Sequence, residues 1–408
     1  MTAPTRQTQA TDGLRIAVIG AGLAGTSAAR HLAQAMPDQV EAIALYEIGR
    51  GPGGRAATRR TRAVPEFRVN HGAPYADITT ASGRALIDAL GEAVEPYTGA
   101  RVVIDAASGD CRDRPVPDGV ALIRGADGEM ANLAQGLLQD AKGQPIDAIQ
   151  PRYTEMVRGL HRSPDAGSRW HLTDKQGEAI GSADWLVVAG SGIAHPRWSK
   201  TFGGQPPLVQ AAAGLSDARL DEALAVIAGQ GAAPVLTVFC HLTGQAAEPW
   251  RALGFEDGLI EGHPTLAKVS IQPLEGQSCA VVLHSTAEYA RSNAGVYGAS
   301  SSAARVGDAS SSADREGEII DDLLAALAGM PGLPTPDPAD CAFGPLMHRW
   351  GNAFAEGEPL PAALAVCPEA RVAFCGDYVA TDARMASVES ALVSGAQVAD
   401  GVAVAVSS

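Results

Sequence analysis

The chain has 408 residues, of which 46% are hydrophobic and 19% charged, and its formal net charge is −15. This length supports a large core and predicts two domains, and the acidic balance argues against nucleic acid or an anionic membrane as a partner. The six cysteines form no C-x-x-C pair and have no zinc spacing, so we expect no metal site, no disulfide framework and a reducing cytoplasm.

Residues 1–13 are polar and contain no apolar stretch, so we expect a disordered lead-in and no secretory signal. A buried strand is expected over the apolar run 14–19, and it leads directly into Gly20-Ala21-Gly22-Leu23-Ala24-Gly25. This spacing is typical of a dinucleotide site. Gly20 allows the turn, Gly22 lets the backbone approach a pyrophosphate, and Gly25 lets the next helix pack closely on the strand.

That helix is expected over 26–36, and the N–H groups at its start, with those of Leu23 and Ala24, would face the phosphates. A second strand is expected over 42–46 and ends at Glu47. An acid roughly 20 residues past the last motif glycine accepts the two hydroxyls of an adenosine ribose.

A second glycine motif, Gly53-Gly54-Arg55, favours FAD over NAD as the dinucleotide. The glycine pair lets the loop close over the same pyrophosphate, and Arg55 can bind it through two hydrogen bonds. We interpret the basic residues that follow, Arg59, Arg60 and Arg62, as solvated charge.

The rest of the chain alternates between helical and strand patterns. Helices are expected over 82–95, 129–140 and 321–328, and strands over 152–160, 170–173, 185–189, 235–242, 266–272 and 280–285. A polar Pro/Gly-rich stretch occupies 97–119, and the Ser/Ala/Gly-rich stretch 291–313 is expected to be a mobile surface insertion. The apolar stretch 398–406 contains Asp400 and Gly401, which predicts the end of a buried helix and no membrane span.

With these motifs in order, the chain resembles the amine oxidase/renalase superfamily of FAD-dependent oxidoreductases, and renalase-like proteins most closely. Three further segments carry the resemblance: Asn70–Tyr75 is similar to the family's Asp-His-Gly-Ala-Gln-Tyr, His348–Ala353 to His-Arg-Trp-Arg-Tyr-Ala, and Phe374–Tyr378 with the helix from Ser387 to its C-terminal flavin motif. The chain departs from the family on the substrate side, at Asn70, Pro74, Gly351, Asn352 and at Gln272-Pro273, where a Lys-Pro pair is common.

The resemblance implies an α/β fold, with a discontinuous, GR2-like Rossmann-type FAD-binding domain and a second α+β substrate domain built on a mixed or antiparallel sheet. The FAD-binding domain is expected over 1–80, 125–195 and 340–408, and the substrate domain over 81–124 and 196–339.

The resemblance also implies noncovalent FAD and the residues around it. The segment from Gly72 to Tyr75 would lie beside the isoalloxazine, Val157 would meet the adenine, Asp377 would bind the ribityl chain, and the helix from Ser387 would point at the flavin N1/O2 edge. The expected FAD residues are Gly20, Gly22, Leu23, Ala24, Gly25, Glu47, Gly54, Arg55, Gly72, Ala73, Pro74, Tyr75, Val157, Gly376, Asp377, Ser387 and Val388.

Few acid–base residues are needed where a flavin supplies the redox chemistry. Tyr75 and Trp350 are expected on the two sides of the substrate cavity, with His71 near the flavin. Lys268 is the nearest candidate for the lysine that anchors a water beside the flavin in amine oxidases. Cys375 is expected to be a buried hydrophobic residue and not a covalent flavin link.

Three functions remain open at this point. A renalase-like oxidase would pass a hydride from a dihydronicotinamide, such as NAD(P)H or an isomer, or from another small substrate to flavin N5, with O2 as the acceptor. A flavin amine oxidase would flank its amine with two aromatic rings, but the position of one of them is Ser387 here. The third alternative is a flavin-binding protein without catalysis.

Overall fold

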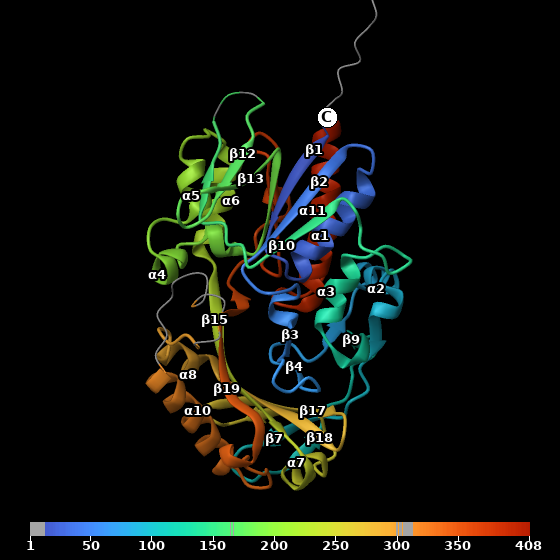
Figure 1. Cartoon of the computed structure of the whole chain (residues 1–408), viewed down its shortest axis with the longest axis vertical. Helices are drawn as coiled ribbons and strands as arrows, with labels where there is room; N and C mark the ends of the chain where they lie inside the picture. Colours follow the sequence, from blue (N-terminus) through green and yellow to red (C-terminus); the bar gives the residue numbers. More distant parts are fainter. Residues whose placement is uncertain (1–12, 164, 166, 299–300, 302–303, 305–312) are drawn as a thin grey trace, which may run out of the picture.

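The computed structural model describes residues 13–163, 165, 167–298, 301, 304 and 313–408. The expected lead-in lies outside the described residues except for Gly13, as does most of the segment 299–312 within the expected insertion. Two large sheets dominate the chain, one towards the top and one at the base of Figure 1, and the long strands β15 and β19 rise from the lower sheet towards the upper one.

The upper sheet has six strands in the order β10-β2-β1-β14-β21-β20. They are β1 (Leu14–Ile19), β2 (Val40–Glu47), β10 (Ile149–Tyr153), β14 (Trp185–Ala189), β21 (Val372–Cys375) and β20 (Val366–Cys367). All neighbours are parallel except β20 and β21. The apolar run of β14 is buried almost throughout and the centre of β1 (Ile16, Ala17 and Val18) is buried, as strands covered on both faces require.

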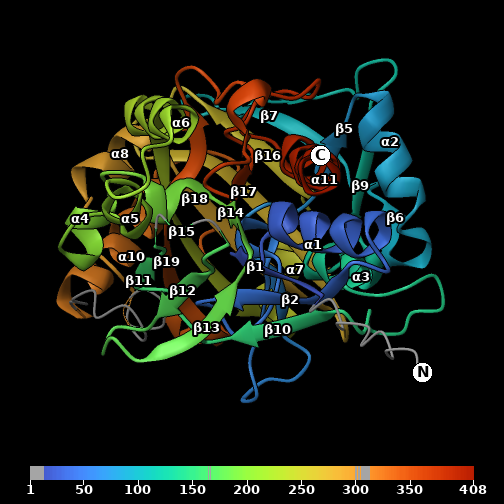
Figure 2. The ribbon, with the colours of Figure 1, turned by 90° about the horizontal axis from the view of Figure 1, so that it is seen from above.

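Two helices from opposite ends of the chain lie side by side against this sheet, α1 (Leu23–Ala35) and α11 (Val388–Ser407) (Figure 2). Small residues make the contact, because a Cβ at Gly395 would lie 2.8 Å from Ser27 Cβ. In the part of the chain that the structure describes, α11 alone is long and apolar enough to cross a membrane. Half of its apolar window is buried inside the molecule, and helices of soluble cores pass the same test.

The lower sheet has seven strands in the order β19-β15-β18-β17-β16-β7-β8 and is antiparallel except between β16 and β7. Its strands are β19 (Cys341–Glu356), β15 (Gly231–Leu242), β18 (Ser278–Ser285), β17 (Leu266–Leu274), β16 (Asp257–Glu261), β7 (Arg101–Asp105) and β8 (Cys111–Asp113). One apolar core joins this sheet to α7 (Gly244–Arg251), α8 (Ala287–Ser292) and α10 (Ala313–Ala328). The expected combination of a Rossmann-type domain and a mixed-sheet domain is confirmed.

Smaller elements connect the two sheets. The hairpin β3 (Thr58–Arg60) and β4 (Arg68–Asn70) packs Phe67 and Val69 against Phe239 of β15. The remaining elements are β5 (Ala76–Ile78), β6 (Val94–Pro96), β9 (Ala121–Gly125), β11 (Gly159–His161), β12 (Trp170–Thr173), β13 (Ala179–Ala183), α2 (Ala81–Asp88), α3 (Ala131–Leu137), α4 (Trp198–Phe202), α5 (Pro207–Ala212) and α6 (Ala218–Gly229).

Several expected elements differ from the structure. The strand expected over 152–160 is split, because Thr154 adopts a left-handed conformation with φ of 62° between β10 and β11. The helix expected over 82–95 ends at Asp88, and β6 occupies the end of that range. The polar stretch 97–119 contains β7 and β8. These strands form because they pair with neighbouring strands, more than because of their own composition.

The packing also divides the chain differently from the expected domain boundaries. Residues 341–356 were assigned to the FAD-binding domain, but they form β19 and pair with β15 in the lower sheet. Residues 207–229 were assigned to the substrate domain, but α5 and α6 pack into the core of the upper sheet through Leu208, Leu220 and Ile227. Ladder pairing and core packing decide both cases, and neither can be read from composition.

Candidate active site

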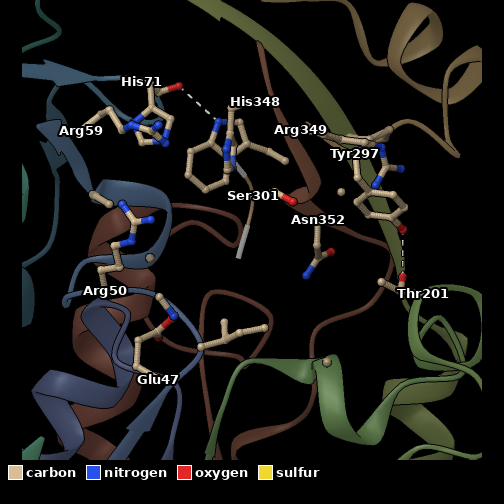
Figure 3. A pocket seen from close by; sticks show the side chains of 18 of the residues that line it. Glu47, Arg50, Arg59, His71, Thr201, Tyr297, Ser301, His348, Arg349 and Asn352 are labelled. Carbon is tan, nitrogen blue, oxygen red and sulfur yellow. Dashed lines mark hydrogen bonds between the residues drawn. The ribbon is translucent and has the colours of Figure 1, made fainter. Parts of the chain in front are cut away.

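A cleft of about 1160 Å³ lies between the carboxyl ends of the upper parallel strands and the long strands β15 and β19 (Figure 3). Its walls come from segments far apart in sequence, with Glu47 and Arg50 at one end and His71, His348 and Trp350 at the other. A crevice at the carboxyl ends of parallel strands is where open α/β sheets bind ligands.

The two glycine motifs touch each other, and of their glycines Gly54 lines the cleft. Gly53 N donates to Ala21 O at 2.8 Å, and Gly22 and Gly53 form an isolated parallel bridge. Gly20 has φ of 106°, which favours glycine, and a Cβ at Gly25 would overlap the Gly20 carbonyl oxygen and lie 2.9 Å from Ala189 Cβ. These glycines therefore set the strand–turn–helix geometry.

The start of α1 is open to a ligand. Gly22 is the N-cap residue, no side chain caps the helix, and the first turn contains no acidic residue. A Cβ at Gly22 would have Gly54 Cα, at 4.0 Å, as its nearest neighbour. The unpaired N–H groups at a helix start, with the positive end of the helix dipole, form a ready site for a phosphate.

Glu47 lies at the end of β2 and lines the cleft. Its Oε2 accepts from Ala21 N at 2.9 Å and its Oε1 from Gly49 N at 2.6 Å, so the carboxylate is held in one orientation. Burial raises the pKa of this carboxyl above its usual range, against the lowering effect of the two backbone N–H groups. Each oxygen keeps one lone pair that can accept a ribose hydroxyl.

Arg55 and Asp377 form a bidentate ion pair between the second glycine motif and the end of β21. Arg55 Nη1 and Nη2 donate to Asp377 Oδ2 and Oδ1 at 2.7 and 2.6 Å, and Nη1 also donates to Ala353 O at 2.9 Å. The Asp377 side chain is 5% exposed and that of Arg55 is 38% exposed. Neither lines the cleft directly. The roles expected for Arg55 at the pyrophosphate and for Asp377 at the ribityl chain stay predictions.

The segment after β4 lies against the second glycine motif. Ala73 N donates to Arg55 O at 3.0 Å, and a Cβ at Gly72 would overlap Arg55 O and lie 3.3 Å from the Trp350 ring. Pro74 lines a separate cavity of about 330 Å³ on the other side of Asn70. Gly72 is therefore required for the close approach of the two segments.

Tyr75 lies in a cluster with Tyr97 and Asp257. Its ring stacks on Tyr97 with a centroid distance of 4.4 Å, and its hydroxyl donates to the buried Asp257 at 3.1 Å. Asp257 also pairs with Arg114 and with Lys268 Nζ, the latter at 2.6 Å. Neither Tyr75 nor Lys268 lines the cleft, and this charged cluster holds both. The placement of Tyr75 opposite Trp350 stays a prediction.

Three aromatic side chains form the inner wall of the cleft, which we call the His–Trp wall: His71, His348 and Trp350. The His71 ring lies 4.9 Å from His348 and 5.0 Å from Trp350, and the last two are 4.1 Å apart. His71 O accepts from Trp350 Nε1 at 3.2 Å, and from His284 Nε2 at the same distance. Residues 348 and 350 share one face of β19 because side chains alternate along a strand.

The His–Trp wall is uncharged at neutral pH. Burial, with the neighbouring His348 and Arg59, lowers the pKa of His71 well below its usual range. Burial and Arg59 lower the pKa of His348 to about 4, and burial and Lys268 lower that of His284 to about 4. Among the described residues, His71 Nδ1 is buried without a hydrogen-bond partner of ordinary geometry.

Other residues predicted to bind FAD lie at the start of α11, in the turn after β21 and in the core of the upper sheet. Ser387 is the N-cap of α11, where its side chain accepts from Ser390 N, and Val388 begins the helix. Gly376 has φ of 146°, which turns the chain out of β21 towards Asp377. Val157 is buried in the core beside the segment that bonds to β2, and it does not line the cleft.

Comparisons with known proteins agree with this architecture. A family model of the NAD(P)-binding Rossmann-like domain matches residues 18–90, and a search of curated proteins found no match. Cyclohexylamine oxidase from Brevibacterium oxydans superposes with a TM-score of 0.61 at 12% identity, over 97% of this chain and 100% of that one. A double mutant of putrescine oxidase, made to redesign cofactor binding, gives 0.57 at 14% identity over 96% and 99%.

The chain has the fold of the FAD-dependent amine oxidases. At these identities the likeness concerns the fold and not the substrate. The residues present fit a dinucleotide, because Glu47 and Gly54 line the cleft and both contact the start of α1: Glu47 Oε2 accepts from Ala21 N, and Gly54 lies against Gly22.

The basic lining of the cleft could not be predicted from the order of residues. Among the described residues, its walls carry one carboxylate, Glu47, and seven basic side chains: Arg50, Arg59, Arg60, Arg197, Lys200, Arg291 and Arg349. These residues come from four separate stretches of an acidic chain, so no local run of charges in the sequence predicts a basic cleft. The one available signal was the Arg59–Arg60 pair, which we interpreted as solvated.

Proposed function

We propose that this protein is an FAD-dependent oxidoreductase that oxidises a small molecule carrying a flat, dihydronicotinamide-type ring. The observation that carries the proposal is the arrangement of one continuous cleft, with a dinucleotide cradle at one end and an uncharged aromatic wall at the other. The fold shared with FAD-dependent oxidases supports the choice of cofactor. A bound flavin would supply the redox chemistry by accepting a hydride.

The protein's own residues would bind and orient the two partners. The N–H groups at the start of α1 would hold the phosphates, and Glu47 would accept the ribose hydroxyls. The Arg55–Asp377 pair would fix the loop of the second glycine motif against the end of β21. A rigid cradle of this kind keeps the reacting atoms in register, which is a large part of catalysis.

The His–Trp wall favours a flat neutral ring over an amine. Trp350 and the uncharged His71 and His348 offer ring faces and edges for stacking. A protonated amine would enter a cleft whose basic side chains outnumber its one carboxylate even after Arg60 and Arg291 are set aside, because those two pair with Glu129 and Glu356. Such a cleft repels a cation. We therefore favour the renalase-like hypothesis over the flavin amine oxidase and over a noncatalytic flavoprotein. We also propose a small-molecule substrate and a cytoplasmic location, which the free state of all six cysteines suits.

Anaerobic stopped-flow reduction of the FAD-loaded protein tests this function. The panel contains NADH, NADPH, their 2- and 6-dihydro isomers, and primary amines including putrescine. We expect at least one dihydronicotinamide to bleach the flavin within seconds and the amines to be inert. Bleaching by amines alone would favour the amine oxidase, and no bleaching by any compound would favour the noncatalytic alternative.

A pair of variants on one strand tests the His–Trp wall. Trp350→Leu should raise the substrate concentration for half-maximal reduction about tenfold, because a stacked ring contributes roughly 1–3 kcal/mol. Phe354→Leu removes an aromatic ring from the same strand, β19, at a side chain that is 52% exposed and outside the cleft. Equal effects of the two substitutions would contradict the assignment of the wall.

A further inference from the structure

Among the described residues, Arg197 and Arg349 are cations of the cleft that pair with no acid. Arg60 pairs with Glu129, and Arg291 pairs with Glu356 at 3.0 Å, so the charge of each is balanced. Arg349 forms no ion pair with any described residue, and its buried Nε has no hydrogen-bond partner. In the described part of the chain, the Arg197 guanidinium donates to neutral acceptors: Gln230 O, Ser191 Oγ and Asn352 Oδ1.

The Arg349 guanidinium is held by contacts with Tyr297 and Gly351. It lies 5.4 Å from the centroid of the Tyr297 ring, whose hydroxyl is 3.1 Å from Thr201 Oγ1 (Figure 3). On its other side it packs over Gly351, where an added Cβ would lie 2.6 Å from Arg349 Nη1. A larger side chain at position 351 would displace the guanidinium, so the glycine that departs from the family pattern makes room for it.

The second departure from the family pattern serves the other cation. Asn352 offers its Oδ1 to Arg197 at 3.4 Å, and both side chains line the cleft. Burial lowers the pKa of Arg197 and of Arg349, which is the expected cost of a desolvated cation without a counter-charge. An anion bound between the walls would relieve this cost, because hydrogen bonds from guanidinium to phosphate or carboxylate are strong and frequently bidentate.

The dinucleotide's own pyrophosphate is not the natural partner of Arg349. The cradle for that group lies at Gly22 and the start of α1, whereas Arg349 projects from β19 towards Tyr297 on the opposite wall (Figure 3). Strand alternation also directs Arg349 to the other face of β19 from the His–Trp wall. The anion must therefore belong to a second molecule and must sit at some distance from its reacting ring.

We propose that Arg349, supported by Gly351 and with Arg197 nearby, binds a phosphate or carboxylate carried by the substrate, so that the enzyme selects anionic substrates. This inference rests on the proposed function for the identity of the ring, but the anion site itself does not depend on it. Arg349 determines specificity through binding and takes no part in bond making or breaking.

The test uses FAD-loaded protein and isothermal titration calorimetry. The first arm titrates inorganic pyrophosphate, which needs no ring and no turnover. The second arm compares nicotinamide mononucleotide with nicotinamide riboside, which differ by one phosphate. We expect the mononucleotide to bind at least tenfold more tightly than the riboside, and Arg349→Met to weaken both phosphate compounds about ten- to one-hundred-fold.

Three variants make the result specific. Arg291→Met removes the same unit of charge from the cleft at an arginine that is already paired, and it should leave the affinities nearly unchanged. Arg349→Lys should restore part of the binding, and Gly351→Ala should weaken it without changing any charge. The flavin content should stay at the wild-type level in all of them, which separates the substrate's anion from the pyrophosphate of FAD.

Two results would overturn the inference: equal binding of mononucleotide and riboside by the wild type, or equal losses in Arg349→Met and Arg291→Met. Loss of flavin in Arg349→Met would likewise reassign the residue to the cofactor. If pyrophosphate binding depends on Arg349 while no dihydronicotinamide bleaches the flavin, the anion site stands and the proposed ring chemistry fails.

Discussion

Substituting alanine for two glycines of the same motif should separate a glycine needed for folding from one needed for binding. At Gly25 an added Cβ would overlap the backbone oxygen of Gly20 and lie 2.9 Å from Ala189 Cβ. The strand and helix would have to move apart, because the first obstacle is backbone. Overpacking of this kind costs about 1–3 kcal/mol, and we expect the upper end of that range.

At Gly22 the same methyl group meets nothing closer than Gly54 Cα at 4.0 Å, and the backbone φ of −69° suits alanine. Gly22→Ala should therefore leave the stability of the flavin-free protein unchanged or raise it by roughly 0.4–1 kcal/mol, through the unfolded state. The methyl group would nevertheless point into the space where the phosphates are expected. We predict a loss of FAD affinity of at least about tenfold.

Thermal unfolding of flavin-free protein and fluorescence titration with FAD measure the two effects separately. Gly25→Ala should lower Tm by several degrees, since each kcal/mol corresponds to about 2–4 °C in domains of 150–250 residues. Gly22→Ala should keep Tm and lose FAD. A Gly22→Ala protein that binds FAD as tightly as the wild type would refute the placement of the pyrophosphate. A Gly25→Ala protein with unchanged Tm would refute the packing argument.

Three further predictions concern charge. Glu47→Gln replaces one acceptor oxygen by an NH2 donor that faces the N–H group of Ala21 or Gly49. FAD titration should therefore show about tenfold weaker binding. Unchanged affinity would mean that Glu47 does not bind FAD. Asp377→Asn weakens the bidentate pair with the partly exposed Arg55, and urea unfolding of flavin-free protein should show a loss of about 1–2 kcal/mol; no loss would mean that solvent already screens the pair. The folded-state pKa of His348 is lowered to about 4 from 6.5, so its contribution to stability is complete above about pH 6.5 and is lost as the pH falls towards 4. His348→Gln should therefore make the free energy of unfolding fall less steeply between these two pH values. An unchanged pH dependence would contradict the burial argument.

Local sequence predicted much of the dinucleotide cradle. The expected strands 14–19, 170–173 and 185–189 match β1, β12 and β14, because short apolar runs between turn residues have few alternative structures. Glycine spacing, the open helix start and the acid at the end of β2 also follow from the order of residues. By contrast, 341–356 was not predicted as a strand, since its pairing with β15 depends on a partner about a hundred residues away.

The aromatic and basic side chains of the cleft were less predictable, because their contacts join distant parts of the chain. Tyr75 carries the family's pattern, yet its ring belongs to a cluster with Tyr97 and Asp257 that no motif contains. His71 and Trp350 are joined by a hydrogen bond across 279 positions of sequence. Arg349, unlike Arg291, pairs with no carboxylate of a described residue.

The sequence by itself determined the strand–glycine–helix unit, the acid that follows it and hence the class of cofactor, because those features arise from backbone constraints within a few tens of residues. Only the tertiary structure decided which side chains face the cleft, which histidines are desolvated and which arginines lack a counter-charge. Burial and charge balance depend on neighbours from distant strands, and the energy of a cation or an imidazole is set by those neighbours and not by its own place in the chain.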